Sequence, residues 1–384
     1  MRTNDLDYDL PDGCIATSAA EPRDAARLLV IDAGSARPAE HHVVADLRTL
    51  LDPGDLLVVN TSRVIPARLV GAREDSGGRA EGLWLGPAGG DAAPGAPALW
   101  RVMIKARRVK PGVRFGLFDQ DDRPAGVTLR LLEPSTEQGE EGGWVCRVEG
   151  PRAAEAANPI ALLQRVGRVP LPPYIRAARK RQHEPDREER DLDRYQCVFA
   201  DRERSGSVAA PTAGLHFTDA LLADLAARGV QRASVVLHVG TGTFKPVETE
   251  FVEQHAMHAE WCELPAATAR AIVAARARGR RVISVGTTTA RTLESFGPAG
   301  ELVERGGSGW TRLLITPGRP WQNLDALMTN FHLPRSTLLA LVAGTLPGGV
   351  PELLRHYREA IAGGYRFYSF GDAMLVLNIR AATQ

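Results

Sequence analysis

The sequence has few of the features that mark a metal site, a disulfide framework or a membrane protein. Its 384 residues contain only 4 cysteines, which lie far apart and form no CxxC pair. We therefore expect reduced thiols and no bound metal. The N-terminus is acidic and carries no apolar stretch, so it does not match the pattern of a secretory signal. The most apolar helix candidate, residues 336–346, has about half of the ~20 residues needed to cross a bilayer, so we expect a cytoplasmic protein without a membrane segment.

A strong charge of either sign is also missing. Lys and Arg number 47 and Asp and Glu number 46, which leaves a net charge of +1. Without a bulk positive charge, any nucleic-acid surface has to be a local basic patch. Hydrophobic residues at 44% and charged residues at 24% are typical of a soluble folded protein and exclude a disordered or fibrous chain. The length favours two or three domains.

What the sequence does contain is two distinct patterns of apolar residues. From residue 71 to 150, short alternating segments such as 127–131 and 144–148 are separated by Gly and Pro clusters, which is typical of a small β domain. In the rest of the chain helical and strand patterns alternate. We therefore predict a mixed α/β fold. A larger, barrel-like α/β core of residues 1–70 and 151–384 carries the catalytic site, and a smaller all-β domain is inserted at residues 71–150.

Capping residues place several elements of the core. Thr218 can cap a helix, and a second helix is expected over residues 265–279. The predicted strands are residues 56–59, 235–239 and 282–285. Residues 176–194 mix charges of both signs without interruption, which favours a solvated linker or an exposed helix over a binding arm.

One candidate ligand site is the glycine-rich string HVGTGTF at residues 238–244, which follows a predicted strand. Glycine allows backbone amides to approach a ligand closely, but the string taken alone is better explained by a tight turn that needs positive φ. The dinucleotide-binding pattern GxGxxG is not met, because Lys245 stands at its last glycine. The candidate contacts are Gly240, Thr241, Gly242 and Thr243.

A second candidate is the string VGTTTAR at residues 285–291, in which three hydroxyls precede a helix predicted over residues 291–296. A helix N-terminus with free N–H groups, hydroxyls and a nearby arginine suits a phosphate or a carboxylate. A helix cap that has more hydroxyls than it needs, beside a surface arginine, explains the string equally well. The candidate contacts are Thr287, Thr288, Thr289 and Arg291.

Histidines recur in three more strings. HAMHAE at residues 255–260 places His255 and His258 one helical turn apart, but the zincin pattern HExxH is absent, which favours hydrogen-bonding histidines over metal ligands. PTAGLHFT at residues 211–218 and TNFHLPRST at residues 329–337 are polar loops ahead of helices, and each taken singly has a structural explanation. Their candidate contacts are Thr212, Gly214, His216, Phe217, Asn330, His332 and Arg335.

Together and in this order, the strings resemble the hallmark series of the S-adenosylmethionine:tRNA ribosyltransferase-isomerases of queuosine biosynthesis. The resemblance covers nearly the whole chain. Thr61 departs from it, since the family usually has an acidic or amide residue at that position. The other strings that carry the resemblance are YDLP at 8–11, RDAARLLV at 23–30, PGDLLVVN at 53–60, VIPARL at 64–69, PLPPYI at 170–175, RYQ at 194–196, GSVAA at 206–210 and YRFYSFGDAML at 365–375.

The resemblance implies an enzyme that uses S-adenosylmethionine as a ribosyl donor and co-substrate. It implies that the acceptor is 7-aminomethyl-7-deazaguanine at the wobble position of tRNA, that adenine and methionine leave, and that the product is epoxyqueuosine. Such a reaction needs a base that removes a proton beside the sulfonium and a donor that helps adenine to leave. It also needs a pocket that takes one nucleotide out of the anticodon loop.

The residues in these strings suit particular roles. We expect the base to be His216 or His238, because imidazole titrates near neutral pH. Glu260 is expected to orient an imidazole or to contact the sulfonium. The expected anion contacts are Thr287, Thr288 and Arg291 for the methionine carboxylate or a phosphate, and Arg63 and Arg335 for RNA phosphates.

The tRNA-binding surface is expected on the inserted domain, and the protein is expected to be a monomer. Residues 101–114 are rich in basic residues and contain no acidic one, which suits phosphate contacts by Lys105, Arg107, Arg108 and Lys110. A strand edge that is kept from aggregating by its charges explains the pattern equally well.

Two other functions stay open. One is a tRNA-binding module that has kept the fold and lost catalysis, and the intact strings argue against it. The other is a conventional methyltransferase, which is disfavoured because no strand-linked GxGxG with an acidic residue after the next strand is visible.

Overall fold

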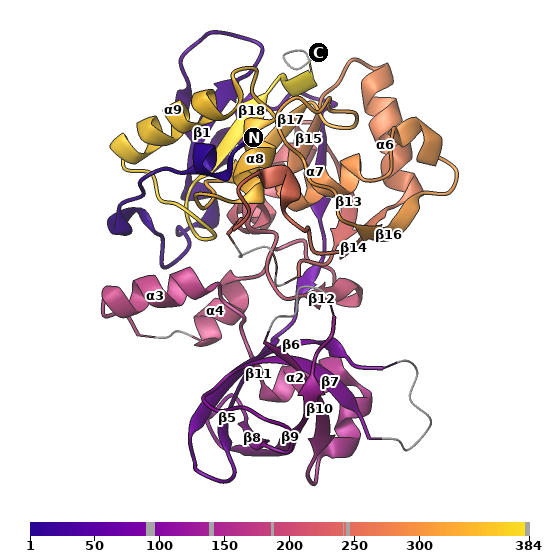
Figure 1. Ribbon diagram of the computed structural model, residues 1–384. Helices are drawn as coiled ribbons and strands as arrows, with labels where there is room; N and C mark the ends of the chain where they lie inside the picture. The colour runs from indigo at the N-terminus through magenta and orange to yellow at the C-terminus, as the bar shows by residue number, and fades with distance from the viewer. Residues whose placement is uncertain (90–96, 138–141, 186–187, 241, 243–245, 381–384) are drawn as a thin grey trace.

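The computed structural model consists of a larger α/β domain and a smaller β-barrel (Figure 1). It describes residues 1–89, 97–137, 142–185, 188–240, 242 and 246–380. No helix in these ranges is both long enough and apolar enough to cross a membrane.

The larger domain is built on a mixed sheet of nine strands. They are β1 (Arg27–Asp32), β2 (Glu40–Val43), β3 (Leu56–Asn60), β13 (Gln231–Leu237), β14 (Glu260–Leu264), β15 (Val282–Val285), β16 (Gly307–Thr311), β17 (Ala326–Asn330) and β18 (Ala373–Leu377). Their order is β16-β14-β13-β3-β15-β17-β18-β1-β2. The central strands β13, β3, β15 and β17 are parallel, so their carboxyl ends lie on the same edge of the sheet.

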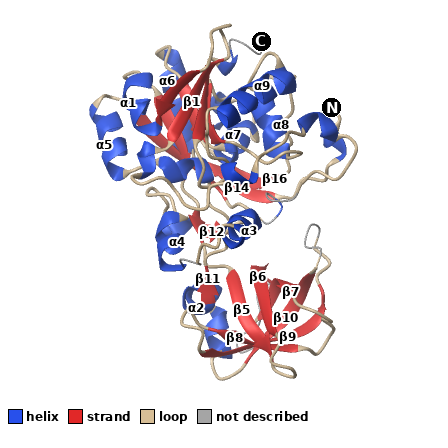
Figure 2. Cartoon of the chain, turned by 90° about the vertical axis from the view of Figure 1, so that its left-hand side faces the viewer, coloured by secondary structure: helices blue, strands red, loops and turns tan. Residues whose placement is uncertain are grey.

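Helices cover both faces of this sheet (Figure 2). They are α1 (Leu47–Leu50), α5 (Asp219–Ala227), α6 (Ala266–Ala277), α7 (Thr287–Glu294), α8 (Thr337–Ala343) and α9 (Gly349–Ala362). Successive side chains of a strand point to opposite faces. On β3, Leu57 and Val59 pack with α1 and α5. Leu56 and Val58 pack with α6 to α9 on the other face, so the strand is buried on both sides.

The smaller domain is a closed barrel of six strands. They are β5 (Arg68–Arg73), β6 (Arg79–Pro87), β7 (Leu99–Lys105), β8 (Arg114–Phe118), β9 (Pro124–Pro134) and β10 (Gly143–Glu149). β5 pairs with β8 as well as with β6, which closes the barrel. At this seam a Cβ on Gly71 would lie 2.4 Å from the backbone oxygen of Gly116, so the close approach needs glycine. Trp84, Trp100 and Phe115 fill the interior.

The predicted fold class, a mixed α/β protein with a smaller all-β domain, is confirmed. The barrel, however, is the smaller domain, and the larger domain has an open sheet where we expected a barrel-like one. Its outer strands β16 and β2 stand at opposite ends of the strand order and do not pair with each other in the described chain. Alternating helical and strand patterns do not reveal this, because closure depends on which two strands meet and not on their local sequence.

Residues beyond the barrel strands also pack on the barrel. α2 (Pro159–Val166) contributes Leu162 and Leu163 to its core, and β11 (Gly167–Arg168) pairs with β5. We therefore infer that the smaller domain extends to about residue 168, beyond the residue 150 expected from the sequence. Turn residues mark where a strand ends, whereas a domain ends where its core contacts end.

Two short helices lie between the domains (Figure 1). They are α3 (Pro173–Arg181) and α4 (Glu188–Arg194). Most of this charged stretch is exposed on helices, which agrees with one of our expectations, but two of its charged side chains are buried. Arg179 and Asp191 are 2% and 5% exposed and form two hydrogen bonds of 2.6 and 2.8 Å. Arg176 of α3 pairs with Glu81 of the barrel at 2.7 Å, so the same stretch joins the two domains.

Candidate active site

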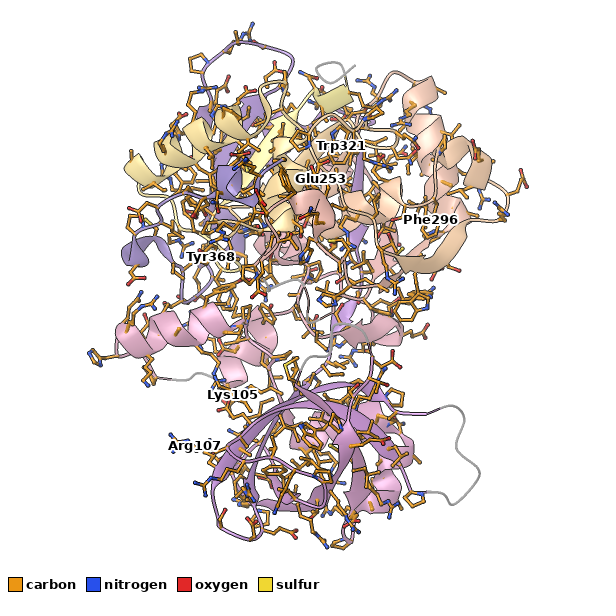
Figure 3. The ribbon with its side chains drawn as sticks, in the orientation of Figure 1. Lys105, Arg107, Glu253, Phe296, Trp321 and Tyr368 are labelled. Atoms are coloured by element: carbon orange, nitrogen blue, oxygen red, sulfur yellow. The ribbon has the colours of Figure 1, made fainter. Side chains whose placement is uncertain are left out.

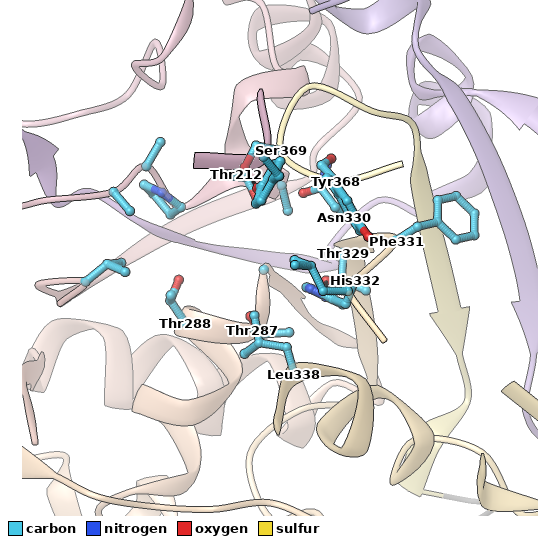
Figure 4. A pocket seen from close by; sticks show the side chains of 18 residues that line it. Thr212, Thr287, Thr288, Thr329, Asn330, Phe331, His332, Leu338, Tyr368 and Ser369 are labelled. Carbon is cyan, nitrogen blue, oxygen red and sulfur yellow. Dashed lines mark hydrogen bonds between the residues drawn. The ribbon is translucent and has the colours of Figure 1, made fainter. Parts of the chain in front are cut away.

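A pocket lies at the carboxyl edge of the parallel strands, the edge where open α/β sheets usually bind ligands. Segments far apart in the sequence form its walls, and Thr287 and Leu338 face Thr212, Ser369 and Tyr368 across it (Figure 4). The predicted contacts that line it are Thr212, Thr287, Thr288, Asn330 and His332.

Helix α7 brings two of these threonines to the pocket. The helix begins at Thr287, four residues earlier than the predicted 291–296, after Gly286 with a φ of +88°. The Thr287 and Thr288 side chains therefore lie at a helix N-terminus with free N–H groups, which is suited to an anion. Thr289 points inward and donates to the Val285 carbonyl at 2.7 Å, so it acts in the helix and does not line the pocket.

The segment of residues 211–218 contributes Thr212, but not all of its predicted contacts. The Phe217 ring is fully buried in the core and packs on Phe199, with 6.0 Å between ring centroids. A Cβ on Gly214 would lie 2.7 Å from the Cys197 sulfur, so Gly214 allows close packing. Gly214 and Phe217 therefore shape the loop and lie outside the pocket lining.

Two predicted histidines are buried, His332 in the pocket lining and His216 beside it. His216 Nε2 lies 3.2 Å from the Asn330 side-chain nitrogen, and burial lowers the pKa of His216 to about 4. His332 Nε2 lies 2.8 Å from the Thr329 hydroxyl, and burial lowers the pKa of His332 to about 3. Both imidazoles are therefore neutral at physiological pH and are tied into the structure.

His238 has a different environment. It follows β13, is half-buried, and stacks on Trp261 with 5.4 Å between centroids. Its Nδ1 lies 2.7 Å from the Ser62 hydroxyl, which lies 2.7 Å from the Ser207 hydroxyl. Burial lowers the pKa of His238, nearby Arg204 lowers it further, and Glu263 opposes them. Among the described residues no bond to Nε2 of this ring is found. His238 is not itself in the pocket lining, but the next residue, Val239, is.

Glu260 and Arg291 contact each other. Both side chains are about 5% exposed, and an Arg291 Nη1 donates to a Glu260 carboxylate oxygen. The other Glu260 oxygen accepts from the Gly240 backbone N–H at 2.9 Å. The ion pair thus ties α7 to β14 and to the glycine-rich turn. Opposite charges that are both brought out of water stabilise each other, so the structure places Arg291 and Glu260 together in a buried ion pair.

The glycine-rich turn is described only in part, since Thr241 and Thr243 lie outside the described residues. A Cβ on Gly242 would lie 1.8 Å from the His258 ring, so the turn packs directly on that histidine. His255 and His258 are both half-buried. Within the described ranges no group of three or more His, Cys, Asp or Glu side chains is placed to hold a metal.

The two arginines expected to bind phosphates lie outside the pocket. Arg63 is on β4 (Arg63–Val64), at a second cavity of about 250 Å³ that also touches Gln120 of the barrel. The backbone of Arg335 has a φ of +53° and bonds to Leu6 and Val247.

Asn60 supports the pocket through Thr288 and was missed. It ends β3, is 1% exposed, and its side-chain nitrogen donates to the Leu237 carbonyl at 3.0 Å and to the Thr288 hydroxyl at 3.2 Å. Its oxygen accepts from the Leu237 and Ser62 backbone N–H groups. One amide thus joins β3, β13 and α7. A polar residue at the end of a fully apolar strand is the signal that could have revealed it.

Two aromatic residues of the pocket were also missed. The Tyr174 and Tyr368 rings both line it, with 4.7 Å between their centroids. Tyr368 has a φ of +72°, a strained conformation for a bulky residue that persists only when the surroundings hold it. The two residues are almost 200 positions apart in the sequence, so only the fold brings them together.

The predicted RNA-binding residues form a basic patch on the barrel, made of Lys105, Arg107, Arg108 and Lys110. All four side chains are exposed, and none has an ion pair in the described part of the chain. Lys105 and Arg107 lie on the side of the barrel nearest α3 and α4 (Figure 3). Consistent with this, Lys105 pairs in register with Glu81, which contacts α3 through Arg176.

Comparison with known proteins gives close relatives over the full chain. Residues 3–376 match the family described as queuosine biosynthesis protein. The sequence is 49% identical to the S-adenosylmethionine:tRNA ribosyltransferase-isomerase of Gloeobacter violaceus, covering 98% of this chain and 96% of that protein. It is 47% identical to the protein of the same name from Anaeromyxobacter dehalogenans, covering 98% and 99%. A solved structure, the S-adenosylmethionine tRNA ribosyltransferase of Thermotoga maritima, is 31% identical, covers 97% of this chain and 100% of that chain, and has a TM-score of 0.49.

Proposed function

Because this chain belongs to the family of queuosine biosynthesis proteins, we propose that it is an S-adenosylmethionine:tRNA ribosyltransferase-isomerase. It transfers and isomerises the ribosyl group of S-adenosylmethionine onto 7-aminomethyl-7-deazaguanine in tRNA, gives epoxyqueuosine, and releases adenine and methionine. Two bonds of the ribosyl group break, to adenine and to sulfur, and each leaving group takes the bonding electron pair; adenine also takes up a proton. Two electron pairs replace them. One is that of the aminomethyl nitrogen, which bonds to the ribosyl group and loses a proton, and the other is that of the carbon beside the sulfonium, which loses its proton to the base and forms a new bond within the isomerised group.

The observation that carries this proposal is the convergence of four strings on one pocket. Residues 211–218, 285–291, 329–337 and 365–375 each contribute lining residues. These strings are the ones that resemble the ribosyltransferase-isomerases, and each alone has a structural explanation. A pocket built from all of them is what a shared substrate requires.

We assign the general base to His238 and not to His216. A general base must bind and release a proton at reasonable cost. The Ser62 hydroxyl beside His238 Nδ1 can rotate to donate or to accept, so it serves both the neutral and the protonated ring. The Asn330 amide nitrogen beside His216 Nε2 can only donate, so protonation there would set two donors against each other.

The N-terminus of α7 is our candidate for the methionine carboxylate. Thr287 and Thr288 line the pocket beside free backbone N–H groups, and the helix dipole favours negative charge there. Arg291 forms an ion pair with Glu260, so we assign it the role of holding α7 in place beside the pocket.

The basic patch on the barrel is our candidate for tRNA phosphates, and the enzyme would work in the cytoplasm as a monomer with no metal. The four side chains carry no opposing ion pair in the described ranges and lie toward the linking helices. Neutralising phosphates with such residues supplies affinity without sequence specificity.

The test is to mix the protein with S-adenosylmethionine and tRNA bearing the aminomethyl deazaguanine. We expect release of adenine and methionine together with a mass gain of the RNA. The same tRNA with guanine at the wobble position should give no turnover, because it lacks the amine that is ribosylated. Release of S-adenosylhomocysteine would show methyl transfer instead, and binding of tRNA without turnover would show a non-catalytic module.

A further inference from the structure

Asn330 lines the pocket and carries a buried hydrogen-bond acceptor (Figure 4). The residue ends β17 and is 2% exposed. Its Nδ2 donates to the Tyr368 carbonyl at 3.2 Å and lies 3.2 Å from His216 Nε2. Its Oδ1 is buried and bonds to no other described residue. A buried polar atom without a partner costs stability, so an otherwise fully bonded side chain with one bare oxygen calls for a ligand.

The two neighbours fix which way the amide faces. The Tyr368 carbonyl only accepts hydrogen bonds, so it must face Nδ2. Nδ2 then also faces His216 Nε2, which accepts from it in the tautomer that carries its proton on Nδ1. A reversed amide would set oxygen against oxygen at Tyr368 and leave two N–H groups in the pocket. Asn330 Oδ1 therefore requires a donor from whatever fills the pocket.

The surroundings of this oxygen fit a flat ring that carries the donor. The Tyr174 and Tyr368 rings lie on the same pocket wall, and aromatic side chains of this kind stack on nucleobases. The hydroxyl-bearing residues Thr212 and Ser369 also line the pocket, together with Thr287, Thr288 and Thr329. An acceptor beside an aromatic wall suits the exocyclic amino group of a purine-type base.

We propose that Asn330 is a specificity-determining residue that accepts a hydrogen bond from the exocyclic amino group of a purine-type base, and that His216 is the positioning residue that holds its amide. The inference rests on the proposed function, in which two bases carry such an amine. One is the adenine of S-adenosylmethionine and the other is the deazaguanine of the tRNA.

The test replaces each amine in turn. One arm uses S-inosylmethionine, in which the adenine amine is an oxygen, and the other uses tRNA whose aminomethyl deazaguanine lacks its 2-amino group. We expect the wild-type protein to disfavour one of these analogues by about tenfold or more in kcat/KM, the scale of one hydrogen bond. The Asn330→Ala and Asn330→Ser variants should lose that preference, and the arm in which it is lost identifies the base.

Variants of His216 test whether this residue positions the Asn330 amide. His216→Gln keeps an acceptor for Asn330 Nδ2 and should keep the preference, whereas His216→Leu should weaken it. His356, a buried histidine of α9 outside the pocket lining, provides the matched control. His356→Leu should change thermal stability and leave the preference intact.

Two results separate the inference from the proposed function. The wild-type protein could turn over both analogues with the same kcat/KM as the natural substrates, or the Asn330 variants could keep the wild-type preference. Either result would show that Asn330 does not recognise the amino group. If the wild-type protein releases no adenine from the natural substrates, the proposed function fails before the analogues are compared.

Discussion

At the scale of single residues, the two candidate histidines differ in what stands beside the ring, and this leads to opposite expectations. We predict that His238→Asn lowers kcat by about 100-fold or more, the usual scale of a general base, and leaves S-adenosylmethionine binding nearly unchanged. His216→Gln should keep most of kcat, because its neighbour needs only an acceptor. Single-turnover rates and equilibrium binding measure the two effects, and an unaltered rate in His238→Asn would remove that residue from the mechanism.

The charges around His238 give a second prediction at this scale. A base acts in its neutral form, so kcat/KM should rise with pH through the pKa of His238, which burial lowers from its usual value. Arg204 lowers this pKa and Glu263 raises it. Arg204→Gln should therefore move the acidic limb of the pH profile to higher pH, and Glu263→Gln should move it to lower pH. Shifts of the same sign in both variants would mean that another group controls the limb.

At the scale of elements, α3 and α4 are joined by a buried ion pair. Arg179 makes two hydrogen bonds to Asp191 and two more to the Thr17 carbonyl. Removing one partner leaves an unpaired buried charge, so Asp191→Ala should lower the free energy of unfolding by about 3–5 kcal/mol. Urea denaturation measures the loss.

The matched control for this element prediction removes both charges. Arg179→Met with Asp191→Leu should cost clearly less than Asp191→Ala alone, because an apolar pair leaves no unpaired charge. If Asp191→Ala is no less stable than the wild-type protein, the pair does not hold the two helices together.

At the scale of the whole molecule, a nearly neutral protein has to bind a polyanion. We predict that neutralising Lys105, Arg107, Arg108 and Lys110 together weakens tRNA binding and flattens its salt dependence. Each lost phosphate contact should reduce the log–log slope by about 0.7 to 0.9. The KM for S-adenosylmethionine should not change, because its proposed site lies in the other domain. Titrations over a range of salt concentrations measure the slope.

The control variant for the patch neutralises four exposed arginines away from the pocket edge, namely Arg228, Arg232, Arg278 and Arg280. They lie near the amino ends of β13 and β15, whereas the pocket lies at the carboxyl ends. This variant has the same charge change and should keep the wild-type slope. Equal slopes in the patch variant and the wild-type protein would assign the patch to solubility and place the RNA elsewhere.

Much of this protein was predictable from its sequence, because the signals are local. Strand β15 has the bounds that its apolar residues predicted, Val282–Val285. Thr218 caps α5, as predicted, by accepting a 3.0 Å hydrogen bond from the Leu221 N–H. The family strings named Thr212, Thr288 and Asn330, which all line one pocket.

Only the tertiary structure shows which groups meet. Burial separates His216 from His238, and an ion pair between β14 and α7 occupies Glu260 and Arg291. The smaller domain, and not the larger one, closes into a barrel at Gly71. Periodicity and capping depend on neighbours along the chain, so the sequence alone determined the elements and the family. Desolvation, charge pairing and strand closure depend on residues that meet only after folding, and therefore only the fold could assign them.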